Sequence, residues 1–168
     1  MADEDPHRVV AALDDARAAF DGRDGTPTYE VGLDPDDAET TQLRKACRLL
    51  GACRTLQAND GYHTSVVEMS FAALERSLEF YALSETRDTF REFQTHEAAY
   101  DRAAELGVLS PTTADELYGL HRDHRSAAYY RDSVATERQA ETVFRLAVAV
   151  HEHVIDLARR SHDCRCSG

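Results

Sequence analysis

The segment over residues 120–133, LHRDHRSAAYYRDS, concentrates side chains that can bind anions or transfer protons. It holds three arginines, two histidines and two tyrosines within fourteen residues. Arginine binds phosphate through paired hydrogen bonds, and histidine exchanges protons near neutral pH because its pKa lies at about 6.5. The segment is therefore a candidate active site or binding surface, with a solvated helix face as the plain alternative.

The helical spacing of this segment favours a functional interpretation. A stripe that begins at Leu117 continues through His121 to Arg125 and Ala128, so a face that should be apolar becomes polar midway. A buried or half-buried charge needs a partner or a purpose. In the alternative interpretation, Arg125 only pairs with acidic neighbours and the two tyrosines only cover the end of the helix.

The rest of the chain is strongly acidic. Its net charge is −12, and Lys45 is its only lysine. Such a surface repels a phosphate backbone, so only a local arginine patch is compatible with nucleic-acid binding. An acid excess with almost no lysine is typical of halophilic proteins, which work in molar salt, where charge repulsion is screened over about 3 Å. A GC-rich genome that favours arginine codons is the alternative explanation.

Two groups of residues have the types that bind metals. His121 and His124 are three positions apart on one predicted helix face, which is a suitable ligand spacing. The residues that would have to complete this set form no recognisable motif: Glu68, Glu75, His151, Glu152 and His153. We therefore expect neither a metal nor a cofactor.

The second group, His162, Cys164 and Cys166, lies near the C-terminal end of the sequence. No second pair of ligands is close to it in sequence, so a frayed tail is the favoured interpretation. Cys47 falls within an apolar helical pattern and is expected to be a small core residue.

Periodic apolar residues predict helices over residues 6–20, 37–58, 62–83, 95–107, 109–130 and 137–160. The third range is the clearest, because one face carries Val67, Phe71, Leu74, Leu78 and Tyr81. The closing range has a similar stripe of Ala140, Val143, Ala147, Val150, Val154 and Leu157. No convincing strand appears, apart from a short extended piece over residues 28–31. The expected fold is all-α, an up-and-down bundle of four main helices with one or two short ones.

Length and targeting signals complete these expectations. A chain of 168 residues suits a single domain. The acidic N-terminal stretch has no apolar core of a signal peptide, and no apolar run approaches the roughly 20 residues of a membrane span. We therefore expect a soluble cytoplasmic protein with no membrane contact.

Three stretches carry a resemblance to a known family: GYHTSVVEMSFAALERSLEFYALSE, THEAAYDRAAELGVLS, and LYGLHRDHRSAAYYRDSVATERQAETVFRLAVAVHEHV. Their order resembles the HEPN family of helical-bundle domains, in which a shorter helix, a helix with a basic motif and a long closing helix follow one another. The resemblance covers residues 59–158 and extends more loosely over residues 1–58. It implies one HEPN-like domain over residues 1–168, with N-terminal helices to residue 58, a core over residues 59–163 and a flexible tail over residues 164–168.

Ribonucleases of that family carry an Arg, often followed by Asn or Asp, and a His after a short spacer. Arg122 and Asp123 match the start of this motif, but Ala127, Ala128 and Tyr129 occupy the positions where the His would fall. A count from Arg125 begins at Tyr130 and also finds no His. The resemblance therefore implies a ligand-binding set of Arg122, Asp123, Arg125, Tyr129 and Tyr130, with Arg122, His121 and His124 as the candidates for any catalysis.

Two functions follow from the resemblance. In the first, the chain is a non-catalytic module that binds a nucleotide, RNA or a nucleotidyltransferase-type protein in a toxin–antitoxin or defence setting. In the second, it is a metal-independent endoribonuclease with a divergent, Arg-based site. Members of the family commonly pair with their motifs facing one cleft, so a homodimer with its axis near residues 121–130 is expected.

Overall fold

The structure, a computed structural model, describes residues 6–22, 26–34, 36–59, 61–130, 134–159 and 162–166, without the side chains of residues 127–130. The chain divides into two units, Met1–Val31 and Gly32–Gly168.

The first unit contains one described helix, α1 (His7–Phe20). The sequence predicts this helix, and its apolar face carries Val9, Leu13 and Phe20. These side chains are exposed, because no second described helix of the same unit covers them. The amphipathic pattern thus forms the predicted helix but contributes no buried residue.

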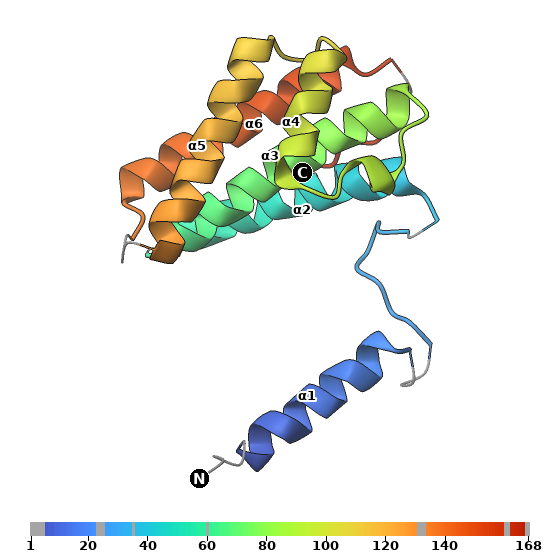
Figure 1. The fold of residues 1–168 in the computed structure, drawn as a ribbon, viewed down its shortest axis with the longest axis vertical. Coiled ribbons are helices and arrows are strands. Elements are labelled where there is room, and N and C mark those ends of the chain that lie inside the picture. Colours follow the sequence, from blue (N-terminus) through green and yellow to red (C-terminus); the bar gives the residue numbers. More distant parts are fainter. Residues whose placement is uncertain are drawn as a thin grey trace. The chain divides into compact units, whose positions relative to one another are not determined.

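The second unit is a bundle of helices whose order follows the prediction (Figure 1). The elements are α2 (Ala38–Ala58), α3 (His63–Glu85), the 3-10 turn η1 (Phe90–Glu92), α4 (His96–Glu105), α5 (Pro111–Tyr130) and α6 (Glu137–Leu157). Helix α3 packs against α2, α6 and α4, while α4 and α5 pack on each other. The described residues form no strand, and residues 28–30 are irregular, so the all-α prediction is confirmed.

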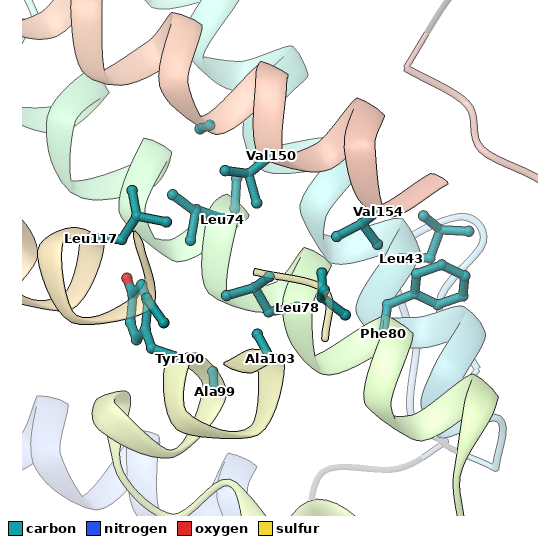
Figure 2. Close-up of a cluster of buried hydrophobic side chains, with 14 of the residues drawn as sticks. Leu43, Leu74, Leu78, Phe80, Ala99, Tyr100, Ala103, Leu117, Val150 and Val154 are labelled. Atoms are coloured by element: carbon teal, nitrogen blue, oxygen red, sulfur yellow. The ribbon is translucent and has the colours of Figure 1, made fainter. Parts of the chain in front are cut away.

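The core is built from the stripes that the sequence shows. Leu43 and Leu50 of α2 belong to the same buried cluster as Leu74 and Leu78 of α3 and Val154 of α6. Figure 2 shows Leu43 beside Val154 and Phe80. The stripe of α6 ends earlier than predicted. Leu157 is 38% exposed, because it is the last residue of the helix and the chain turns away after it.

Several predicted helix ends are confirmed by their hydrogen bonds. Thr95 accepts from the Ala98 N–H at 3.3 Å and begins α4, and Thr136 forms a capping box with Gln139 at the start of α6. Ser110 caps α5, because its hydroxyl accepts from the Thr113 N–H at 3.1 Å.

None of the described helices is long and apolar enough to cross a membrane.

Two leucine variants compare a buried residue in the α3 stripe with the exposed residue at the end of the α6 stripe. We expect Leu74→Ala to lower the free energy of unfolding by about 2–5 kcal/mol, because the side chain is fully buried. Leu157→Ala removes the same atoms from a half-exposed position and should cost less than about 1 kcal/mol. Urea unfolding followed by circular dichroism measures both. Equal losses would contradict the structure and restore Leu157 to the core.

Candidate functional site

The carboxylate of Glu75 is buried inside the bundle, where the residue is only 2% exposed. Its Oε1 lies 2.8 Å from Nδ1 of His121, and its Oε2 lies 2.8 Å from Nδ1 of His96. The Tyr100 hydroxyl donates a longer hydrogen bond of 3.4 Å to Oε1. A buried acid therefore joins α3 to both α4 and α5. We call these four residues the Glu75 network.

Local structure explains how the network assembles. The cap at Thr95 makes His96 the first residue of α4, and Tyr100 follows one turn later on the same face. Helix α5 returns antiparallel to α4, so the ring of His96 meets that of His121 at 5.2 Å and Tyr100 meets Tyr118 at 5.6 Å. The two aligned pairs set the register between the helices.

The network keeps Glu75 ionised. Burial by itself would raise the pKa of this carboxyl group, but hydrogen bonds from His121 and His96 outweigh it and lower the pKa below its ordinary value. The pKa of Tyr100 is raised, first by burial and then by the negative charge of Glu75. Tyr100 therefore remains a protonated donor, and Glu75 carries the negative charge of the network.

The two histidines of the network differ in access to solvent. The side chain of His121 is 8% exposed and stacks on Phe71 with ring centroids 4.5 Å apart. The side chain of His96 is 46% exposed. Because Glu75 holds Nδ1 of His96, the Nε2 atom on the far side of the ring remains for solvent or a ligand. His96 can therefore exchange a proton or bind an anion, whereas His121 mainly positions the network.

The structure separates the residues of the predicted binding set. Arg122 and Arg125 are exposed, and the Arg122 guanidinium lies over the Tyr118 ring at 5.9 Å. Arg122 follows His121 in α5 and lies one helical turn after Tyr118, which contacts Tyr100 of α4 at 5.6 Å. Arg122 also forms a long ion pair of 3.5 Å with Asp123.

Asp123 and His124 lie on the other side of α5, where they line a pocket of about 250 Å³. Its remaining lining residues come from α3, α5 and the start of α6: Val67, Phe71, Leu120, Ala135, Gln139 and Val143. Burial lowers the pKa of His124, and its Nε2 has no hydrogen-bond partner among the described residues. The side chains of Tyr129 and Tyr130 lie outside the described part of the chain.

The metal site considered around His121 and His124 does not form. His121 is bonded to Glu75, while His124 stacks on Phe71, and Nε2 of His153 is 2.8 Å from the Val108 carbonyl oxygen. Glu75, His96 and His121 have the right types for a metal. Their 2.8 Å nitrogen–oxygen separations are nevertheless those of hydrogen bonds, since two such ligands of a tetrahedral zinc lie about 3.4 Å apart. The geometry fits a proton-sharing network.

Sequence reasoning missed the role of two residues in this site. Glu75 carries a detectable signal, because it lies four positions after Phe71 and so places a charge on a buried face of α3. His96 carries no such signal, since its position at the start of a short helix is equally typical of a solvated side chain. Only the packing of α4 on α3 connects the two.

The ionisation of Glu75 predicts a pH-dependent contribution to stability. Since the pKa of Glu75 is lowered in the folded protein, its stabilisation is complete above the ordinary value of 4.5 and is lost as the pH falls through the folded value. Glu75→Gln should lower the free energy of unfolding by about 1.5–3 kcal/mol at about pH 6, and by less at about pH 4. Urea unfolding at both pH values measures the difference.

Glu79, also buried in α3, provides the matched control. Burial raises its pKa, so its ionisation opposes folding as the pH rises. The cost of Glu79→Gln relative to wild type should therefore be larger at about pH 4 than at about pH 6, opposite to Glu75→Gln. The same pH trend in both variants would contradict the assignment of charge to Glu75.

Comparison with known proteins identifies a family but no activity. Residues 4–166 match the model of a domain of unknown function, DUF8154. No curated protein and no solved structure matches the chain. Because the match spans nearly the whole sequence, the chain belongs to the DUF8154 family.

Proposed function

We propose that this chain is a HEPN-like helical module that binds the phosphate of a nucleotide or of RNA at the face shared by α4 and α5. The observation that carries the proposal is the pair of hydrogen bonds that His96 and His121 donate to the Glu75 carboxylate. These bonds fix His96 with its Nε2 directed away from the buried carboxylate, and Arg122 is the residue after His121, the other histidine of the network. A phosphate at this face would meet one permanent cation, Arg122, and one imidazole, His96.

The charge of the molecule favours a localised site. With a net charge of −12, most of the surface repels an anion, so binding depends on the few places where cations are held in position. Arg122 is such a cation, because its guanidinium lies over the Tyr118 ring while the side chain remains 63% exposed. Arg125, one turn further along α5, extends the cationic face.

The proposal includes the two protein partners that the family resemblance implies, a second copy of the chain or a nucleotidyltransferase-type protein. In a homodimer arranged about α5, the arginines of two copies would line one groove and bind a phosphate between them. A nucleotidyltransferase-type protein in a toxin–antitoxin or defence pair is the alternative occupant of this face.

The binding proposal predicts a specific loss in an arginine variant. We expect Arg122→Ala to weaken binding of a fluorescein-labelled single-stranded RNA about tenfold, which corresponds to about 1.4 kcal/mol. Arg145→Ala removes the same charge from an exposed position on α6 and should bind as wild type does. Fluorescence anisotropy at low and at molar salt measures both. Equal affinities of the two variants, or no binding by the wild type, would contradict the proposal.

The second candidate function is a metal-independent endoribonuclease, and the Glu75 network also favours it. RNA cleavage by the 2′-hydroxyl needs one group that accepts a proton and another that returns one to the leaving oxygen. His96, oriented by a buried carboxylate, is suited to one of these roles, and Arg122 to stabilising the charge on the phosphorus oxygens. The described residues supply no evident second proton-transfer group at this face, so binding remains the first proposal.

An assay of RNA cleavage distinguishes the endoribonuclease from the binding module. If the site is catalytic, wild-type protein should shorten total RNA in the presence of a chelator, and His96→Gln should reduce the rate at least a hundredfold. His153→Gln is the matched control, because His153 is outside the network and hydrogen-bonded to a backbone carbonyl. Intact RNA after prolonged incubation with wild-type protein that binds it would exclude the endoribonuclease and leave the binding module.

A further inference from the structure

A second polar cluster lies away from the Glu75 network and contains Cys47 of α2, His151 of α6 and the two cysteines of the C-terminal segment. Cys47 Sγ lies 3.7 Å from Cys164 Sγ and 3.9 Å from His151 Nε2. His151 Nε2 also lies 3.3 Å from Cys164 Sγ and 3.2 Å from Cys166 Sγ. One ligand atom from each of the four residues lies within 4.8 Å of all the others.

These distances are those of a tetrahedral zinc site. With zinc–sulfur bonds of about 2.3 Å and a zinc–nitrogen bond of about 2.0–2.1 Å, neighbouring sulfur atoms lie about 3.75 Å apart. A sulfur and a nitrogen ligand lie about 3.5 Å apart in the same geometry. Four of the six separations, at 3.2–3.9 Å, scatter around both values, and all six are within 4.8 Å. They are far longer than a disulfide bond of about 2.05 Å, and all four cysteines of the chain are free thiols.

The hydrogen bonds of Ser77 prepare His151 as a ligand. The Ser77 hydroxyl donates its hydrogen to the Ala73 carbonyl at 2.8 Å. Its oxygen also lies 2.8 Å from Nδ1 of His151, so it must accept the Nδ1 hydrogen. The neutral ring then carries its lone pair on Nε2, which is the atom that faces the three sulfur atoms. A metal-bound histidine is held in this tautomer by a second hydrogen bond of the same kind.

The C-terminal segment is held in place by contacts outside the cysteines. Asp163 forms an ion pair of 2.5 Å with the buried Arg44, and Nε2 of His162 lies 3.2 Å from the Ile155 carbonyl oxygen. Arg54 donates to the Cys166 carbonyl at 3.3 Å. Cys164 and Cys166 pack against the core. The frayed tail expected from the sequence is therefore wrong for residues 162–166, because α2 and α6 supply the partners that no nearby sequence does.

We propose that Cys47, His151, Cys164 and Cys166 bind one structural Zn²⁺ ion, which fastens the C-terminal segment to α2 and α6. Three thiolates and one imidazole are a soft ligand set that selects zinc over hard cations such as magnesium or calcium. The four protein ligands complete the tetrahedron and leave no open position for a substrate, so the site is structural. The guanidinium of Arg54, bonded to the Cys166 carbonyl, lies near the site and offsets its excess negative charge.

The test uses the full chain, reduced, stripped of metal and then supplied with zinc. We expect one zinc per chain by mass spectrometry of the metal content after removal of free ion. Cys164→Ser together with Cys166→Ser should abolish this binding. Cys53→Ser is the matched control, because Cys53 is a buried thiol outside the cluster that contacts the Val66 carbonyl and Ser70. The control should retain one zinc.

Cobalt substitution tests the ligand set in the wild-type chain without any variant. Co²⁺ bound by thiolates in a tetrahedron gives visible ligand-field absorption together with a sulfur-to-metal charge-transfer band. Both should appear at one equivalent and disappear when zinc is added. Zinc should also raise the melting temperature of the wild type and of Cys53→Ser but not of the double variant, whose helix content is checked by circular dichroism.

Three results would overturn the proposal. The first is a reduced wild-type chain that takes up no zinc. The second is equal zinc uptake by wild type and the double variant. The third is cobalt binding without the thiolate charge-transfer band. A disulfide formed on air oxidation by a chain that binds no zinc when reduced would identify the cysteines as a redox pair instead.

Discussion

The packing of α4 and α5 on α3 depends on the buried charge of Glu75. A carboxylate removed from water costs several kcal/mol unless charged or polar partners replace its hydration. His96 from α4, His121 from α5 and the hydroxyl of Tyr100 provide those partners. Because each comes from a different turn of two antiparallel helices, satisfying Glu75 also sets how α4 and α5 pack on α3.

Helix α3 supports both polar clusters from different faces. Glu75 and Ser77 are two residues apart and thus about 200° apart around the helix. Glu75 contacts α4 and α5, while Ser77 contacts His151 of α6. The same helix therefore orients the ring of His96 on one side and the proposed zinc ligand on the other. In both places a buried polar group of α3 fixes the Nδ1 atom of a histidine and leaves its Nε2 atom for other contacts.

The two proposals assign different tasks to these clusters. The Glu75 network has an exposed histidine beside an arginine, so it can meet a ligand from solvent. The cysteine cluster has four protein ligands around one point and no open position, so it can only stabilise the fold. An acidic chain of this size gains from such a crosslink, since repulsion among its carboxylates opposes the compact state.

Much of the fold could be predicted because helices depend on local patterns. Periodic apolar residues defined the helical ranges, and the stripe of α3 lies in the core with Tyr81 at its edge. Val66, Ala73 and Phe80 are buried as well, although they lie off that stripe. Caps such as Thr95 and Thr136 were also visible, since a cap and its partner are three residues apart. The polar interruption at His121 indicated a buried partner, which is now identified as Glu75.

The sequence by itself determined the all-α class, the order of the helices and the concentration of charge on α5, because each depends on residues within a few turns of one another. Tertiary structure alone decided which distant side chains meet. Cys47 lies 117 residues before Cys164, and His96 lies 21 residues after Glu75. No local pattern records such separations, since they depend on how whole helices pack. The same packing places Cys164 and Cys166, which the sequence assigns to a frayed tail, against the core.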